Sequence, residues 1–414
     1  MEPQVRKVSY KLYPNKTQTV ALWEMLVLHQ RLYNACLEER IRAYEWRKKI
    51  EAHRDLTDDE RTGFKRGSTF FGQCHGLTEL RRTLPEYSTL SVRSLRTTLN
   101  RIDWAFKAFF RRVKKGETPG FPRFKSVDRF PGFGFKEHGK GWKFTPGEEW
   151  KHGRLYIKGV PGKLRCRGKA RTPGEVRTAE LMHNDGVWRL SLTIQCQPKR
   201  KAGRASAGLD WGVSKFATLV PRNGKPVEIL PPRFLDAMER KLKHEQRALS
   251  RKKRGSGRRR KQRIRYGRLF RRVVNKRRDF EHQLSKRLVD QYGMIATEKL
   301  NVAGMTASAK GTMENPGKNV KQKAGLNRRI LDTSPTEFLD KLKYKIEEAG
   351  GTWVEVPTRK VKPSQTCPAC GHQEKKKLSD RVHRCAKCGY REDRDRAAAR
   401  VMLKWADENM ASAA

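Results

Sequence analysis

The sequence contains little negative charge. Its 414 residues include 44 Asp and Glu against 94 Lys and Arg, which gives a formal net charge of +50 at pH 7. A surface with this imbalance repels cationic partners and attracts polyanions, among which nucleic acid is the first candidate. An anionic membrane surface is the alternative. We therefore expect a protein that works on nucleic acid.

Long apolar runs are also absent. No segment approaches the roughly 20 apolar residues of a membrane-spanning helix, which weakens the membrane alternative. The first 16 residues, MEPQVRKVSYKLYPNK, contain no apolar stretch suited to a secretory signal. We therefore expect a cytoplasmic protein without a membrane partner. Disulfides are not expected in that reducing compartment.

Cysteine is scarce, and half of it is clustered. Four of the eight cysteines are isolated and are interpreted as buried thiols; these are Cys36, Cys74, Cys166 and Cys196. The others form two CxxC pairs, each followed by glycine and separated by residues 371–384. This spacing predicts a zinc ribbon with one structural Zn²⁺ and no open position for water. Its four ligands are Cys367, Cys370, Cys385 and Cys388.

The N-terminal half mixes strand and helix patterns. RKVSYKLYP (6–14) alternates polar and apolar residues, as a strand does. Residues 17–44 and 91–116 repeat apolar residues at helical spacing, and residues 150–200 contain several short strand patterns. This order predicts a β-module that is entered by one early strand and interrupted by a helical insertion.

The C-terminal half follows a different order. Three strands, a basic helical region, a strand, a helix, a strand and a final helix follow one another from about residue 205. The segments are 206–212, 215–221, 226–232, 235–291, 292–300, 334–351, 351–358 and 393–410. This succession predicts an RNase H-like nuclease fold, with the cysteine segment inserted between the last strand and the last helix.

Three acids lie where such a fold brings chain ends together. Asp210 and Glu298 each end an apolar strand, and Asp395 begins the final helix. Carboxylates that meet unpaired repel and raise one another's pKa, and two Mg²⁺ ions relieve that repulsion. A metal pair of this kind directs water at a phosphodiester. Helix capping is the alternative role of Asp393 or Asp395; we expect Asp393 to cap and Glu392 to be exposed.

The positive charge is concentrated. Residues 247–278 contain 17 Lys or Arg and no acid, with aromatic and aliphatic residues interleaved. A solvated charged helix normally mixes signs, so this segment is expected to lie beside phosphate rather than form a disordered tail. RRVKKG (111–116) and GFPRFK (120–125) repeat the mixture of cations and aromatics, which can stack on unpaired bases. Which cation contacts RNA and which contacts DNA stays open.

With these residues in view, the chain resembles the TnpB family of transposon-encoded RNA-guided nucleases, ancestral to type V CRISPR effectors. GLDWGVSKFATL is similar to the first RuvC motif of the family and ATEKLNVAGM to the second. SQTCPACGHQ and RCAKCGYREDRDRAAA resemble its zinc ribbon running into the third motif. The resemblance is dense from about residue 205 to 405 and thinner before residue 200.

The resemblance implies an α+β multidomain protein. It has an N-terminal wedge-like β-barrel with a helical recognition insertion, and a RuvC-like α/β nuclease domain with an inserted zinc ribbon. The implied ranges are 1–16 and 117–202 for the barrel, 17–116 for the insertion, 203–358 and 393–414 for the nuclease domain, and 359–392 for the ribbon. Such a protein acts in the bacterial or archaeal cytoplasm, near the nucleoid.

The resemblance also implies partners and roles. A structured guide RNA from the transposon end would pair with double-stranded target DNA and displace one strand, while the protein reads a short adjacent motif. A monomer is favoured. Position by position, Asp210, Glu298 and Asp395 are the catalytic carboxylates. Ala397 stands where the family usually has Asn, which is not a metal ligand, so we expect activity to survive.

Other functions remain open at this stage. One is a compact type V CRISPR effector that uses a CRISPR RNA, which gene neighbourhood would distinguish. Another is a nuclease-dead guided DNA-binding repressor, against which the intact acids count. A transposase proper is disfavoured, because no tyrosine-type nucleophile motif is recognisable.

Overall fold

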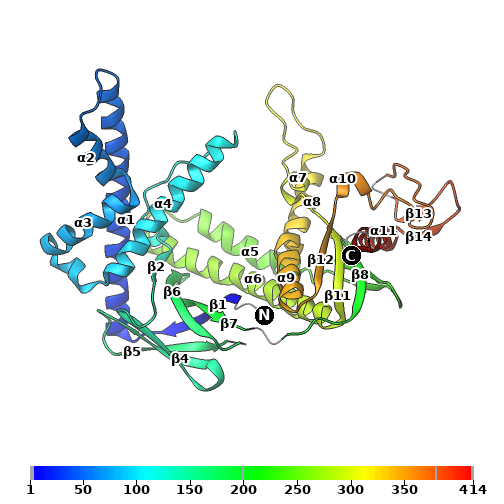
Figure 1. Cartoon of the computed structure of the whole chain (residues 1–414), viewed down its shortest axis with the longest axis horizontal. Helices are drawn as coiled ribbons and strands as arrows, with labels where there is room; N and C mark the ends of the chain where they lie inside the picture. Colours follow the sequence, from blue (N-terminus) through cyan, green and yellow to red (C-terminus); the bar gives the residue numbers. More distant parts are fainter. Residues whose placement is uncertain (1–3, 171, 198–199, 378–379, 412–414) are drawn as a thin grey trace. The chain divides into compact units, whose positions relative to one another are not determined.

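The chain divides into two compact units, Met1–Gln197 (unit 1) and Pro198–Ala414 (unit 2). The computed structural model describes residues 4–170, 172–197, 200–377 and 380–411 (Figure 1). Within these ranges, no helix combines the length and the apolar character needed to cross a membrane.

Unit 1 begins with a strand and one long helix. Strand β1 (Gln4–Tyr13) leads into α1 (Lys16–Glu51). Asn15 and Gln18 form a capping box, because each side chain accepts a hydrogen bond from the other residue's backbone N–H. The other helices of this unit are α2 (Asp58–Ser68), α3 (Phe70–Thr83) and α4 (Val92–Lys114).

The helices of unit 1 pack over a polar group that is fully enclosed. His29 of α1 is buried against Phe133, with the two rings stacked at 4.9 Å. Its ring nitrogens lie 2.8 Å from Thr98 Oγ1 and 3.1 Å from Ser94 Oγ, both on α4. Burial lowers the pKa of His29 to about 3, and the charge of Arg101 adds to this shift. His29 is therefore a neutral part of the core.

The strands of unit 1 form one antiparallel sheet in the order β2-β6-β7-β1-β5-β4-β3. Their bounds are β2 Gly132–Phe135, β3 Trp142–Pro146, β4 Lys151–Ile157, β5 Lys163–Lys169, β6 Glu175–Asn184 and β7 Val187–Cys196. The edges are β2 and β3, yet Phe135 and Trp142 on these edges have ring centroids 6.0 Å apart. The sheet is therefore curled, although no hydrogen-bonded ladder joins its two edges in the described residues.

Unit 2 is built on a five-stranded sheet in the order β10-β9-β8-β11-β12. The strands are β8 (Ala205–Trp211), β9 (Ala217–Pro221), β10 (Val227–Ile229), β11 (Tyr292–Glu298) and β12 (Thr352–Val356). The first three run antiparallel in succession, whereas β11 pairs in parallel with both β8 and β12. The mixed α/β order predicted for an RNase H-like fold is confirmed.

Helices pack on both faces of this sheet. Leu209 and Ile295 point to one face, where they share a core with Phe338 of α9 (Pro335–Glu348) and with α6 (Gly257–Gln291). Ala296 points to the other face and packs against Met402 of α11 (Arg394–Ala411). The two faces thus alternate along each strand.

The remaining helices surround these layers. The basic region predicted to contact phosphate is helical, in α5 (Phe234–Ser250) and α6, with a break at residues 251–256. The short helix α7 (Val302–Met305) precedes α8 (Val320–Thr333) along the chain, and a second short helix, α10 (Thr358–Val361), follows β12. The cysteine segment contains a small hairpin, β13 (Val382–Arg384) and β14 (Arg391–Asp393), which runs directly into α11.

Candidate metal sites in unit 2

Asp210 and Glu298 lie side by side at the ends of the two central strands. The parallel ladder of β8 and β11 pairs Gly208 with Ala296 and Leu209 with Thr297. Asp210 and Glu298 are the next residues on each strand. Paired residues of adjacent strands point to the same face, so both carboxylates leave the sheet on the face that α11 covers.

The first turn of α11 brings Asp395 to the same face. A Cβ atom built on Gly208 would lie 1.9 Å from the carbonyl oxygen of Ala399, so only glycine permits this approach of helix to strand. Asp395 lies one helical turn before Ala399, and Asp210 lies two residues after Gly208. The closest packing of α11 on β8 therefore lies next to the acids.

The electrostatics of Asp210 reflect this arrangement. Its pKa is raised well above the usual value, first by burial and then by the negative charges of Glu298 and Asp395, while Arg394 opposes the shift. Burial also raises the pKa of Glu298. Both shifts disfavour the ionised carboxylates when no cation is bound. The three acids predicted from the sequence thus interact in the fold.

The three carboxylates do not close on a single ion. In the part of the chain that the structure describes, the four cysteines alone form a group whose ligand atoms all lie within 4.8 Å of one another. Asp210, Glu298 and Asp395 therefore do not form a comparably compact group among the described residues.

Asp393 caps α11 and is tied to the rest of the site. Its Oδ1 accepts hydrogen bonds from the backbone N–H groups of Asp395 (3.0 Å) and Arg396 (3.2 Å), as expected from the sequence. Its Oδ2 lies 2.9 Å from Lys215 Nζ. The same ammonium lies 3.0 Å from Glu228 of β10, and Arg396 Nε donates to that carboxylate at 2.7 Å. Lys215 and Arg396 thus bind the start of α11 to the sheet edge.

Lys215 was not predicted from the sequence as part of this site. A signal was present, since this lysine follows Asp210 by five residues within the turn that joins two apolar strands. In a chain with 94 cations, however, one lysine carries no distinguishing charge pattern. Its role depends on Glu228 and Asp393, which lie far away in the sequence.

The expectation that Glu392 is exposed is wrong. Its side chain is 15% exposed, and its Oε2 accepts a hydrogen bond of 2.6 Å from the Tyr390 hydroxyl. Arg400 Nε lies 3.0 Å from the same oxygen. Glu392 on β14 is held by Arg400 in the second turn of α11, a contact that the local sequence does not reveal.

The four clustered cysteines form two matching turns. In each turn the first cysteine donates its backbone N–H to the residue five positions later, and the glycine after the pair donates back to that cysteine. Gly371 and Gly389 have φ angles of +74° and +75°, which residues with a side chain rarely adopt. The two turns are therefore repeats of one backbone structure.

The sulfur positions suit a tetrahedral metal. Cys367 Sγ lies 3.6 Å from Cys388 Sγ, and Cys370 Sγ lies 3.6 Å from Cys385 Sγ. Zinc–sulfur bonds of about 2.3 Å in a tetrahedron place the sulfurs about 3.8 Å apart. A backbone hydrogen bond from Cys388 lowers the pKa of the Cys385 thiol to about 6. For Cys388, a backbone hydrogen bond from Tyr390 is outweighed by the neighbouring thiols, which raise the pKa to about 12, so a metal would have to displace this proton. The donor set is therefore compatible with one Zn²⁺.

The isolated cysteines differ in exposure. Cys166 and Cys196 are buried, whereas Cys36 and Cys74 are half-buried. Burial raises the pKa of Cys36 and of Cys166 to about 12, so these two thiols stay protonated and unreactive. The interpretation as buried thiols holds fully for two of the four.

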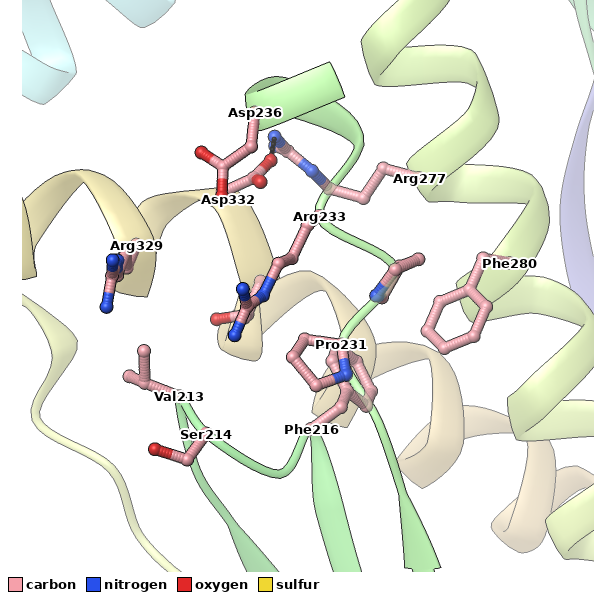
Figure 2. Close-up of a pocket in the computed structure, with 12 residues that line it drawn as sticks. Val213, Ser214, Phe216, Pro231, Arg233, Asp236, Arg277, Phe280, Arg329 and Asp332 are labelled. Carbon is pink, nitrogen blue, oxygen red and sulfur yellow. Dashed lines mark hydrogen bonds and ion pairs between the residues drawn. The ribbon is translucent and has the colours of Figure 1, made fainter. Parts of the chain in front are cut away.

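A pocket opens beside the turn that follows Asp210 (Figure 2). Val213 and Ser214 from this turn line it together with the segment before α5 and with parts of α6 and α8. Arg277 and Asp332 form an ion pair of 2.6 Å across it. Arg233 and Arg329 also line it, and neither has an ion-pair partner among the described residues. The pocket thus places cationic groups beside the turn that follows Asp210.

Comparison with known proteins identifies relatives. Three family models match: "Probable transposase" over residues 189–309, "Cas12f1-like, TNB domain" over 336–402 and "Helix-turn-helix domain" over 1–49. In this structure the described part of residues 1–49 is β1 followed by the continuous helix α1, so it contains no helix-turn-helix.

Curated relatives extend the match. InsQ of Escherichia coli (strain K12), whose name assigns it RNA-guided DNA endonuclease activity, is 33% identical over 312 residues, 75% of this chain and 73% of InsQ. A Streptomyces pristinaespiralis protein with the same description is 28% identical over 97% of this chain and 90% of its own length. A TnpB-like protein of Acanthamoeba polyphaga mimivirus, L79, is 27% identical over 48% of this chain and 37% of its own.

The fold has a solved counterpart. The structure of a Cas12f1 complex with single-guide RNA and target DNA superposes with a TM-score of 0.60 at 12% identity, covering 97% of this chain and 99% of that one. At this identity the likeness concerns the fold. Together with InsQ and the family models, it shows that the chain belongs to the TnpB family.

Proposed function

We propose that this chain is an RNA-guided DNA endonuclease of the TnpB type. In this proposal it binds a structured RNA from a transposon end and cleaves double-stranded DNA beside a short adjacent motif. The observation that carries the proposal is the position of Asp210 and Glu298 on the sheet face that the first turn of α11 covers. InsQ, to which the chain is similar over most of its length, is named for the same activity.

Asp210, Glu298 and Asp395 would hold two Mg²⁺ ions. Carboxylate oxygens are the hard donors that this cation prefers. The pKa of Asp210 is raised first by burial and then by the charges of Glu298 and Asp395, and a bound cation would offset both effects. The ions would supply an activated water and neutralise charge on the scissile phosphate. The chain's own residues supply the geometry: β8 and β11 fix two carboxylates, and the capped start of α11 fixes the third.

The four cysteines would hold one structural Zn²⁺. All four ligand positions belong to sulfur, which leaves no place for water, so this ion would fold the ribbon rather than take part in hydrolysis. The hairpin β13–β14 continues into α11, and Lys404 of α11 donates to the carbonyl of Pro368 at 3.4 Å. A folded ribbon would therefore hold the start of α11 and with it Asp395.

The domain assignment belongs to the same proposal. The barrel would comprise residues 1–16 and 117–202, with the recognition insertion at 17–116. The nuclease domain would comprise 203–358 and 393–414, and the ribbon 359–392. The curled sheet of unit 1, with β1 between β7 and β5, supports this reading. Guide RNA, target DNA and the displaced strand would be the partners of a monomer.

Replacement of Asp210 tests the proposal. The chain is purified with the RNA that accompanies it, and cleavage of a matched plasmid is measured with and without Mg²⁺. Asp210→Ala is expected to lose cleavage by at least about a thousandfold, with RNA and DNA binding nearly intact. Asp290→Ala removes an exposed acid of α6 and is the matched control, expected to cut normally. Normal cutting by Asp210→Ala, or the absence of bound RNA, would overturn the proposal.

A further inference from the structure

We propose that an exposed aromatic surface at the C-terminal end of α4 binds unpaired nucleotides of the guide RNA. The surface, called here the α4 aromatic surface, comprises Phe106, Phe109, Phe110 and Phe121. The identity of its partner as guide RNA rests on the function proposed above. The site itself rests on the contacts and charges of unit 1.

The aromatic rings form a connected group. Phe106 and Phe110 are stacked with centroids 6.3 Å apart, and Phe121 meets Phe109 edge-on at 5.3 Å. Phe121 also meets Phe106 edge-on at 5.7 Å. Two segments of chain, the end of α4 and the loop at residues 117–125, thus share one cluster. Edge-to-face and offset contacts of this kind hold rings in defined positions.

Phe106 packs against the core of unit 1, whereas the rings of Phe110 and Phe121 are exposed. The buried face of α4 ends at Ile102, and no residue from 103 to 121 is buried. Phe110 is 56% exposed and Phe121 48%. Clustered exposed aromatics mark a binding surface more often than isolated ones do. Figure 1 shows the end of α4 projecting away from the sheet of unit 1.

The loop that carries Phe121 and Phe124 is anchored. Asn34 of α1 accepts the backbone N–H of Lys125 at 2.9 Å and donates to its carbonyl at 3.0 Å. Gln30 donates to the same carbonyl at 2.6 Å. Pro119 and Pro122 restrict the chain in between. Preorganised rings lose little conformational entropy when a ligand stacks on them.

The charge around the rings is one-sided. Residues 104–125 contain seven Lys or Arg and a single acid, Glu117. Five of these cations have no carboxylate partner among the residues that the structure describes, and all are exposed; they are Arg111, Arg112, Lys114, Lys115 and Arg123. Exposed rings next to unpaired cations match a single strand, whose bases stack while its phosphates are neutralised.

This charge also selects among occupants. A second copy of the chain would bring the same seven cations against these, which disfavours dimerisation through this surface. A duplex keeps its bases stacked on each other and leaves the rings unused. In the proposed function the guide RNA is bound before the target DNA arrives, so we assign its unpaired nucleotides to this surface of unit 1.

The test is a binding measurement with RNA-free protein. The probe is a fluorescent 15-nucleotide oligouridylate, compared with DNA of the same length and with an RNA duplex. Phe110→Ala is expected to weaken oligouridylate binding about 5- to 150-fold, as for the loss of one stacked base. Arg111→Gln is expected to lower the salt dependence of binding by about 0.7 in slope. Duplex binding by Phe110→Ala should not change.

Tyr44→Ala is the matched control. Tyr44 of α1 is 67% exposed, but its cationic neighbours Arg42 and Arg47 are already paired with Glu38 and Glu51. This variant should bind oligouridylate like the unmodified chain. Unchanged circular dichroism of Phe110→Ala excludes misfolding, since this ring lies outside the core.

Other outcomes would overturn the inference. These are unchanged oligouridylate affinity in Phe110→Ala, loss of affinity for the DNA strand alone, loss of binding to phosphatidylserine vesicles alone, or a dimer that Phe110→Ala dissociates. Cleavage is not part of the assay, so an inactive chain that still requires Phe110 for RNA would reject the proposed nuclease and keep this surface. A chain that cuts DNA while Phe110→Ala binds RNA normally would do the reverse.

Discussion

The two candidate metal sites of unit 2 are built in opposite ways. The cysteine site is local and compact: its ligands come from two short turns of the same structure, and its sulfur atoms stand 3.6 Å apart in pairs. The carboxylate site is assembled from three elements that lie far apart in the sequence, β8, β11 and α11. The comparison teaches that the cysteines are brought together by local backbone turns, whereas the carboxylates are brought together by tertiary packing.

Removing a cysteine should have the largest effect on this comparison. Cys385→Ser leaves three sulfurs, and binding of structural zinc is worth on the order of 10 kcal/mol to such small modules. We expect zinc content to fall from one ion per chain to none, with rapid hydrogen exchange over residues 366–393. Cys74→Ser, which removes a half-buried isolated thiol in unit 1, should keep its zinc. A Cys385→Ser chain that retains a full equivalent of zinc would contradict the four-cysteine site.

Breaking the tie between the sheet and α11 should have the next largest effect. Lys215→Met removes the ammonium that lies within 3.0 Å of both Glu228 and Asp393. Loss of a group that orients a metal ligand typically costs about 10- to 100-fold. We expect slower cleavage and a higher Mg²⁺ concentration for half-maximal rate, at unchanged DNA affinity.

Lys215→Arg keeps the charge and should restore most of the Mg²⁺ response. A purely structural lysine would lower thermal stability without moving that response. If Lys215→Met and the unmodified chain require the same Mg²⁺ concentration, Lys215 does not position Asp395.

His29 is a buried polar group that needs no ion, and it can be compared with the buried carboxylate of Asp210. His29 is enclosed like Asp210, but Thr98 and Ser94 already satisfy its ring. The pKa of His29 in the folded chain is about 3, below the ordinary 6.5, so the unfolded chain takes up a proton at a higher pH than the folded chain. The free energy of unfolding therefore decreases as the pH is lowered from about 6.5 to about 3. Between pH 7 and pH 5 the expected loss is about 2 kcal/mol.

Urea unfolding of unit 1, followed by hydrogen exchange of α1 at the two pH values, measures this loss. His29→Gln retains hydrogen-bonding groups but does not titrate, so it should flatten the dependence. Equal pH dependence in both proteins would show that His29 is protonated in the fold.

The smallest expected effect concerns the turn glycines. Gly371→Ala places a side chain at φ +74°, which costs about 1–2 kcal/mol although no atom blocks the Cβ position. Zinc affinity, measured by competition with a chelator, should fall roughly 5- to 30-fold. Gly63→Ala in α2, where the Cβ position is also open, should leave zinc affinity unchanged and stabilise its helix by about 1 kcal/mol. Equal affinities in all three proteins would mean that the turns adapt.

The sequence predicted the parts of unit 2 that depend on local pattern. The succession of strands and helices along the chain follows from the apolar runs, and the cysteine cluster follows from the spacing of two CxxC pairs. The structure contains both. The contacts of Lys215 and Glu392 could not be predicted, because their partners lie on other elements and no periodicity relates them. The catalytic roles of Asp210, Glu298 and Asp395 stay predictions.

In unit 1 the sequence predicted the types of the elements but not how the strands pair. Helix and strand patterns indicated a β-module with a helical insertion, but not the order of seven strands in the sheet. Antiparallel pairing joins β1 to β7 and β5 across most of the unit, and such pairing depends on which apolar faces meet in the core. Similarly, the aromatic residues between 104 and 124 look like an ordinary amphipathic pattern in the sequence. The structure shows that no residue of α4 after Ile102 is buried.

The continuity of β14 with α11 has a mechanical consequence. Asp393 is the last residue of the hairpin and Asp395 lies in the first turn of the helix, so no slack chain separates them. If a bound nucleic acid tilts the β13–β14 hairpin, the first turn of α11 must rotate with the hairpin. Two contacts limit this rotation: the ion pair of Lys215 with Asp393, and the close packing of Gly208 against Ala399.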